Sequence, residues 1–106
     1  MDKKAVIEIV VRFRQILESQ GVQPYRILLY GSYASGTHRE ESDIDIVVIS
    51  DDFTGKSHWE RVKILSEAIY AVFSPIEAVA MTRKEWDLGT SMIAEFARSG
   101  EVLYAS

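Results

Sequence analysis

The chain begins with apolar residues that recur every three or four positions. The members of this pattern are Val6, Ile9, Val10, Phe13, Ile16 and Leu17. Apolar residues at that spacing form one side of an amphipathic helix, and a glycine shortly after the last of them is a common stop. The pattern therefore predicts a first helix that ends at Gly21.

Three short apolar segments lack this helical period. They are residues 25–31 (YRILLYG), 43–50 (DIDIVVIS) and 76–81 (IEAVAM). Each is short and rich in aliphatic or β-branched side chains, so each predicts a strand. Ser32 is expected to open a short helical turn directly after the first strand.

Two capping boxes mark the start of later helices. Ser57 is followed three residues later by Glu60, and Thr82 is followed in the same way by Glu85. A hydroxyl and a carboxylate at this spacing satisfy the free N–H groups at a helix N-terminus. The second box predicts a short helix. The first predicts a long helix that runs until Pro75, and its expected apolar face is Val62, Leu65, Ile69, Val72 and Phe73.

The C-terminal part of the chain is expected to contain an interrupted helix and one more extended segment. Gly89 weakens the helix that follows Thr82, and Ser91 restarts a helix that ends at Gly100. Residues 101–104 (EVLY) then predict a terminal strand or an extended tail. The expected apolar face of the restarted helix is Met92, Ile93, Phe96 and Ala97.

The predicted elements alternate between helices and strands, which defines the fold class. Strands separated by helices indicate a sheet with crossover connections, although the loop at residues 36–42 is short enough for an antiparallel pair. We therefore expect the α/β class, with α+β left open, in the form of a small mixed β-sheet flanked by helices. A chain of 106 residues suffices for one hydrophobic core, so we expect one domain over residues 1–106.

Composition and charge limit the classes of partner. The apolar content of 47% and charged content of 26% are those of an ordinary globular protein. A net charge of −4 with interspersed acids argues against direct binding of nucleic acid, which needs clustered lysine and arginine. The absence of cysteine fits a reducing compartment, and Glu8, Arg12 and Arg14 interrupt any N-terminal membrane span or signal peptide. We expect a cytoplasmic protein.

Two aspartates at the start of the second predicted strand are the first candidates for chemistry. Alternation along a strand places Asp43 and Asp45 on the same side, about 6.6 Å apart. Like charges at that distance repel by about 2.5 kcal/mol at an effective dielectric near 20. A bound Mg²⁺ turns this repulsion into a net attraction, because the ion binds one or two carboxylates together with waters and substrate phosphates. The pair therefore suits a phosphate-bearing substrate, and the alternative is two solvated acids at a strand end.

Gly31 and Ser32 lie where the first strand meets the short helical turn. A missing side chain at Gly31 lets the backbone approach an anion, and Ser32 adds a hydroxyl. On its own such a pair is compatible with an ordinary turn. Its combination with two aspartates at a fixed distance along the chain favours a phosphate site.

The segment Gly31-Ser32, then ten residues, then Asp43-Ile44-Asp45 resembles the motif of a known superfamily. It is similar to the signature of DNA polymerase beta-type nucleotidyltransferases, in their smallest, minimal nucleotidyltransferase (MNT) form. The similarity extends over residues 25–104, from LLYGSYASGT and SDIDIVV to EFARSGEVLY. The resemblance implies a nucleotidyltransferase fold and activity.

The resemblance also implies a third carboxylate on a later strand. Glu77 is the one acid in the third predicted strand, and alternation can point it toward the side of Asp43 and Asp45. It is a glutamate where an aspartate is more usual in the family. The alternative for Glu77 is a charge that keeps an edge strand soluble.

The implied mechanism assigns a role to each of these residues. Asp43 and Asp45 hold two Mg²⁺ ions, and Gly31 and Ser32 hold the β- and γ-phosphates of ATP or another NTP. An acceptor hydroxyl attacks the α-phosphorus, while Glu77 binds the second metal or takes the proton. Tyr33 and Ser35 occupy positions where many relatives carry arginine, and Arg39 or Lys84 are the candidates to compensate.

The implied biological role is that of an antitoxin. Proteins resembling this one are often paired with helical HEPN-type toxins, which they bind or modify with AMP. A homo- or hetero-oligomer is therefore expected, and Ile7 and Val11 widen the apolar face of the first helix into a possible docking surface. The alternatives are deeper burial of these two side chains and an antitoxin that acts by binding alone.

Overall fold

The computed structural model describes residues 1–106 and contains one four-stranded sheet with strand order β3-β2-β1-β4. The elements in chain order are α1 (Lys3–Ser19), β1 (Arg26–Tyr30), α2 (Ser32–Ser35), β2 (Ile44–Ile49), the 3-10 turn η1 (Asp51–Phe53), α3 (His58–Val72), β3 (Ile76–Met81), α4 (Arg83–Leu88), α5 (Met92–Arg98) and β4 (Glu101–Ala105). Every helix and strand expected from the sequence is present.

The sheet is mixed and flanked by helices, as predicted, and its strand directions decide between the α/β and α+β classes. β1 is antiparallel to both β2 and β4, whereas β2 and β3 are parallel and are connected by the crossover helix α3. The short loop between α2 and β2 does produce an antiparallel pair. The fold is therefore α+β, with a mixed sheet flanked by five helices.

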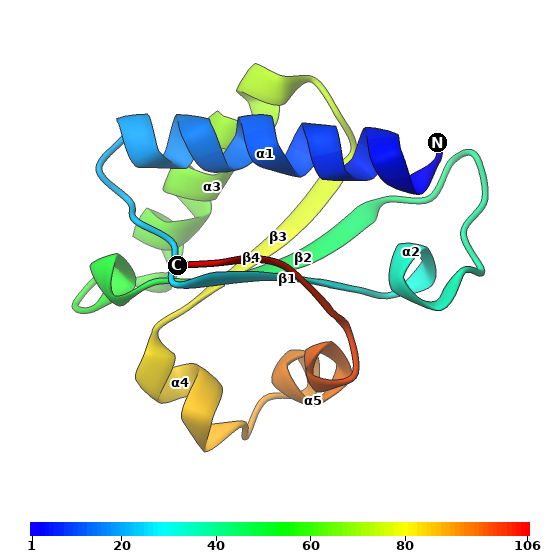
Figure 1. Cartoon of the computed structure of the whole chain (residues 1–106). Coiled ribbons are helices and arrows are strands. Elements are labelled where there is room, and N and C mark those ends of the chain that lie inside the picture. Colours follow the sequence, from blue (N-terminus) through cyan, green and yellow to red (C-terminus); the bar gives the residue numbers. More distant parts are fainter.

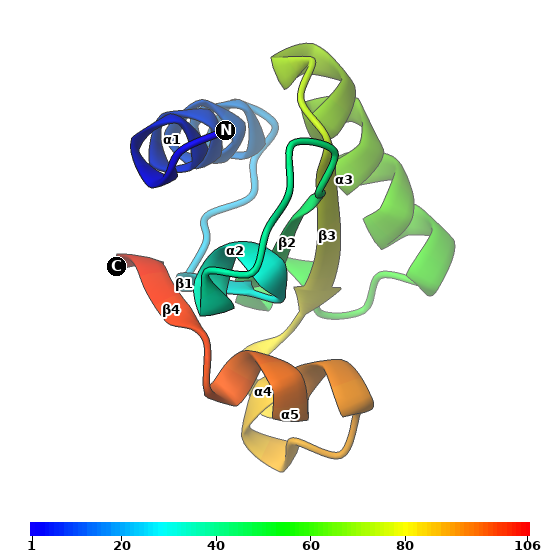
Figure 2. The same cartoon turned by 90° about the vertical axis from the view of Figure 1, so that its right-hand side faces the viewer.

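The helices cover the two faces of the sheet unequally. Figures 1 and 2 show α1 and α3 on one face and α4 and α5 on the other. The main core of 17 buried residues lies under α1 and α3, and a smaller cluster of 6 lies under α4 and α5. Within β1, Leu29 belongs to the main core and Leu28 to the smaller cluster. Burial on both faces explains why residues 27–29 of β1 and 46–49 of β2 are apolar at consecutive positions instead of alternating.

Side-chain caps fix the helix boundaries as the sequence indicates. Both capping boxes form, with Ser57 capping α3 and Thr82 capping α4. Gly89 adopts a left-handed conformation (φ 60°) that ends α4, and the Ser91 hydroxyl accepts a hydrogen bond that starts α5.

Three large apolar side chains predicted on buried helix faces are exposed instead. Phe73 is 88% exposed, Met92 72% and Phe96 58%. Leu65 and Val72 on α3 and Ala97 on α5 are buried as predicted. Phe73 is exposed because α3 ends at Val72 and Phe73 takes the left-handed conformation after it (φ 55°). On α5 the second buried residue is the alanine at 94, so the buried side of this helix is shifted from the one that side-chain size predicts.

Ile7 and Val11 on α1 are also exposed, at 41% and 38%. The alternative of deeper burial for this pair is therefore wrong. No helix of the protein combines the length and the apolar character that crossing a membrane requires.

Candidate active site

The sheet brings three polar side chains into one row. β1, β2 and β3 are in a register that pairs Tyr30 with Asp45 and Asp45 with Glu77. Side chains of directly paired residues project from the same face of a sheet. Tyr30, Asp45 and Glu77 therefore lie next to one another on the face covered by α4 and α5, at the end of the sheet where β1 finishes and β3 begins.

Asp43 joins this row from outside the strand. It is exposed and lies one residue before β2 begins at Ile44. Its charge acts on Asp45 through space. The structure thus brings together the three predicted carboxylates around Asp45.

The local electrostatics at Asp45 are unfavourable to its ionised form. Burial, the Glu77 carboxylate and the Asp43 carboxylate together raise the pKa of Asp45 to about 6. Burial and the two acids Asp45 and Glu77 also raise the pKa of the Tyr30 hydroxyl. The three ion pairs of the chain use other acids, namely Glu18, Glu85 and Glu101. The site acids therefore have no cationic side chain that compensates them.

Gly31 is required at its position because Asp45 lies directly against it. A Cβ built on Gly31 would clash with the Asp45 carboxylate, whose Cγ would be 3.2 Å away, and the φ of 73° is in the region that favours glycine. The space that a side chain at Gly31 would need is filled by the Asp45 carboxylate. We find here the physical reason for a glycine at the end of β1.

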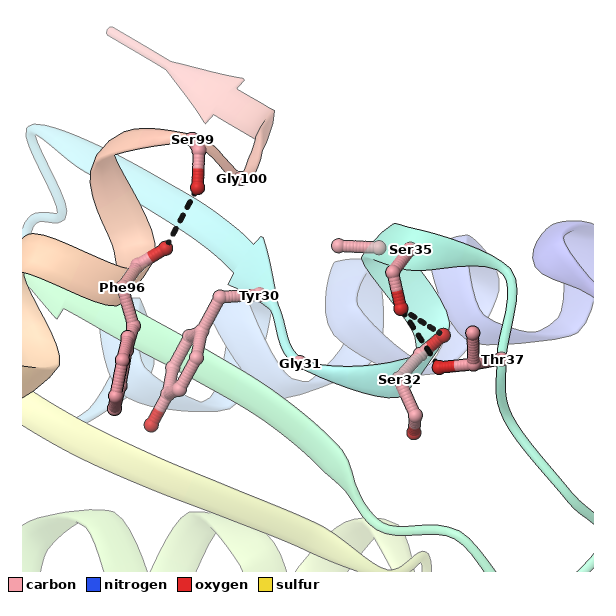
Figure 3. A pocket seen from close by; sticks show the side chains of 9 residues that line it. Tyr30, Gly31, Ser32, Ser35, Thr37, Phe96, Ser99 and Gly100 are labelled. Carbon is pink, nitrogen blue, oxygen red and sulfur yellow. Dashed lines mark hydrogen bonds between the residues drawn. The ribbon is translucent and has the colours of Figure 1, made fainter.

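Ser32 is the first residue of α2 and lines a cavity of about 460 Å³ next to Gly31. In Figure 3 its hydroxyl points away from the hydrogen-bonded side chains of Ser35 and Thr37. The opposite side of the cavity is formed by Phe96 of α5 and Tyr30 of β1. Sequence reasoning gave no role to Tyr30, Thr37 and Phe96, although all three lie in segments that carry the family resemblance. Phe96 has the spacing of a core residue, which predicts burial.

The donor set fits a hard divalent cation bound together with a substrate. Carboxylate oxygens are the ligands that Mg²⁺ prefers, and uncompensated acids are stabilised by a cation. No three acidic or histidine side chains are near enough to one another to hold an ion by themselves. A carboxylate pair completed by phosphate oxygens and water is the usual magnesium arrangement.

The two basic candidates lie in different places. Arg39 is exposed in the loop between α2 and β2, at the same end of the sheet as the acids. Lys84 is in α4, which begins after the C-terminal end of β3. That end of β3 is roughly 13 Å along the strand from Glu77. Lys84 is therefore at the wrong end of the sheet to neutralise a triphosphate at Gly31.

The comparisons with known proteins define the class. A model of the family described as "Nucleotidyltransferase domain" matches residues 10–103. The chain belongs to this family, and it is a nucleotidyltransferase, an enzyme that transfers nucleotidyl groups. Among curated proteins, no sequence matches it significantly.

Solved structures with a similar fold include proteins described as nucleotidyltransferases. A proposed nucleotidyltransferase from Sulfolobus solfataricus superposes with a TM-score of 0.72 at 15% identity, over 95% of this chain and 81% of that one. A structure described as a toxin-antitoxin with AMP-PNP superposes with a TM-score of 0.66 at 21% identity, over 94% of this chain and 73% of that one. A further proposed nucleotidyltransferase superposes with a TM-score of 0.61 at 27% identity, over 90% of this chain and 97% of that one.

Proposed function

We propose that the protein transfers a nucleoside monophosphate, AMP from ATP, to a hydroxyl group of a partner protein. The observation that carries this proposal is the row in which Asp45 is paired with Glu77 and touches Gly31. In that row uncompensated acids lie against Gly31, which together with Ser32 lines a cavity of about 460 Å³. We propose that a metal-bound triphosphate binds at this edge of the cavity. Residues 1–106 act as one domain in this proposal.

Each residue of the site has a role. Asp43 and Asp45 bind Mg²⁺, and Glu77 completes the binding of a second ion or accepts the proton of the acceptor hydroxyl. Gly31 and Ser32 bind the β- and γ-phosphates through the backbone and the free hydroxyl. When bound, the metal ions stabilise the charge on the attacking and the leaving oxygen.

The reaction forms one bond and breaks one. The acceptor oxygen bonds to the α-phosphorus while the bond from the α-phosphorus to the bridging oxygen breaks. Pyrophosphate leaves with the electron pair, and the hydroxyl proton moves to Glu77 or to water. Positioning and charge stabilisation provide most of the catalysis in phosphoryl transfer of this type.

The acceptor is a toxin protein in this proposal. The similar structure with AMP-PNP is described as a toxin-antitoxin, which supports a nucleotide and a partner protein in the same assembly. We propose a helical HEPN-type toxin as that partner. A second candidate function is neutralisation by binding alone, which the exposed side chains of Ile7 and Val11 on α1 favour.

Transfer of labelled AMP tests the proposal. The protein is purified from its native host together with its bound partners and incubated with Mg²⁺ and α-labelled ATP. We expect label on a partner with the wild type and none with the double variant Asp43→Asn/Asp45→Asn. The matched control is Glu8→Gln/Asp87→Asn, which removes two negative charges from exposed positions on α1 and α4 and should leave labelling unchanged.

The outcomes separate the two candidate functions. Label that persists in the double aspartate variant would contradict the assignment of the site. A stoichiometric partner that never becomes labelled would support the antitoxin that acts by binding alone.

A further inference from the structure

The cavity beside Gly31 has two walls of different chemistry. On the α2 side it presents the hydroxyl groups of Ser32, Ser35 and Thr37. On the α5 side it presents the aromatic rings of Phe96 and Tyr30, and no charged side chain lines either wall. Figure 3 shows that both rings extend from their backbones in the same direction. A volume of about 460 Å³ is within the range of small-molecule sites.

The packing of α5 leaves the ring of Phe96 in contact with solvent. Its side chain is 58% exposed, although α5 buries its neighbours Ala94 and Ala97 under the sheet. Apolar ring surface in water is unfavourable, and a flat ligand that covers the ring removes that cost. Phe96 therefore has the properties of a stacking surface.

The position of the aromatic wall relative to the acids indicates which part of a nucleotide would contact this wall. Tyr30 directly precedes Gly31 in the chain and is paired with Asp45 across the sheet. The aromatic wall therefore lies next to the proposed phosphate site at Asp45 and Gly31. A nucleoside attached to the α-phosphate reaches this wall first.

We infer that Phe96, with Tyr30 beside it, forms the surface on which the base of the nucleotide stacks. This inference rests on the proposed function, because it assumes that the triphosphate binds at Asp45 and Gly31. Stacking on an aromatic ring accepts every base, because each has a flat π-face. The site therefore selects for a nucleoside triphosphate over a bare triphosphate, with little preference between adenine and guanine.

Equilibrium binding to the full chain tests the inference without any transfer step. The probes are ATP, GTP and inorganic triphosphate, each titrated in Mg²⁺ into the wild type, Phe96→Ala and Phe96→Trp. The matched control is Met92→Ala, which removes an exposed apolar side chain from the same helix but outside the cavity. We expect Phe96→Ala to weaken ATP and GTP alike by roughly tenfold, as for the loss of one base stack, with triphosphate unchanged.

The remaining variants and outcomes complete the test. Phe96→Trp and Met92→Ala should bind ATP at least as tightly as the wild type does. Equal affinities of the wild type and Phe96→Ala for ATP, or an equal loss for ATP and triphosphate, would overturn the inference but not the proposed function. A wild-type protein that binds neither ATP nor triphosphate would overturn both.

Discussion

Asp45 is the residue at which the structural and chemical constraints of this protein meet. It is paired with Glu77 on one side and with Tyr30 on the other, Asp43 lies two residues before it, and Gly31 contacts its carboxylate. Without a cation, this arrangement works against folding because like charges are held together. A function that needs these acids explains why the protein has such an unfavourable cluster of like charges.

The first prediction concerns the pH dependence of stability without metal. The folded pKa of Asp45 is about 6, above its ordinary value of 3.8, so the folded state binds this proton more tightly than the unfolded state does. The stability that Asp45 contributes is complete below pH 4 and is lost as the pH rises through 6. Solvent screening of this partly exposed group reduces the expected loss to about 1 kcal/mol.

Denaturant unfolding in EDTA at pH 5 and pH 8 measures this effect. Asp45→Asn should abolish the loss between the two pH values, and Asp87→Asn, an exposed aspartate on α4, should retain it. Added Mg²⁺ should restore stability to the wild type mainly at the higher pH. An identical pH dependence in wild type and Asp45→Asn would contradict the electrostatic description of the site.

The second prediction concerns the two glycines on either side of α2. Gly31→Ala places a methyl group against the Asp45 carboxylate at a φ of 73°, whereas Gly36→Ala has a similar φ of 80° but meets no atom within 4 Å. Gly36 has the left-handed helical conformation (ψ 12°), so Gly36→Ala carries backbone strain of about 1 kcal/mol. Gly31 (ψ −152°) lies in a region that is essentially limited to glycine, so Gly31→Ala carries more strain, up to about 3 kcal/mol. Gly31→Ala should lose roughly 2 kcal/mol or more in total and also lose ATP binding.

Gly36→Ala is the control for a positive-φ glycine next to α2 that has no contact with Asp45. Calorimetric titration with Mg²⁺ and ATP should give near wild-type affinity for Gly36→Ala. ATP binding that survives in Gly31→Ala would show that the space beside Asp45 is not used by the nucleotide.

At the scale of elements, local sequence signals predict the helices and strands well. Caps are set by side chains within three residues, so Ser57 and Thr82 fix the starts of α3 and α4 from local information alone. The choice of which face a short helix buries is not determined by local sequence, because it depends on how closely the helix can approach the sheet. This is why Phe96 is exposed although its spacing predicts burial. Phe73 is exposed for another reason, because α3 ends at Val72 and Phe73 adopts a left-handed conformation (φ 55°).

The third prediction belongs to this scale. Ser57→Ala removes the hydroxyl that accepts a hydrogen bond from the Glu60 N–H at the start of α3. We expect a loss of about 1 kcal/mol in the free energy of unfolding, with ATP binding unchanged, because α3 lies on the opposite face of the sheet from the acids. The control is Ser66→Ala, an exposed serine inside the same helix. A loss below a few tenths of a kcal/mol for Ser57→Ala would show that the cap contributes little.

At the scale of the whole molecule, the sheet assembles a site from segments that are distant in sequence. The motif from Gly31 to Asp45 can be recognised in the sequence, and alternation allows Glu77 to face it. The pairing of Asp45 with Glu77 and the contribution of Phe96 cannot be predicted in this way, because they depend on strand order and on the packing of α5. Membership in the nucleotidyltransferase family fits this assembly.

The most direct test of the central claim is whether Mg²⁺-dependent ATP binding requires the two aspartates. Calorimetric titration of ATP, with Mg²⁺ or with EDTA, compares the wild type with Asp43→Asn/Asp45→Asn and with the charge-matched control Glu8→Gln/Asp87→Asn. We predict that the wild type and the control bind ATP only with Mg²⁺, and that the aspartate variant binds at least tenfold more weakly. Equal, Mg²⁺-dependent affinity in all three proteins would contradict the assignment of Asp43 and Asp45 as the residues that hold the metal-bound nucleotide.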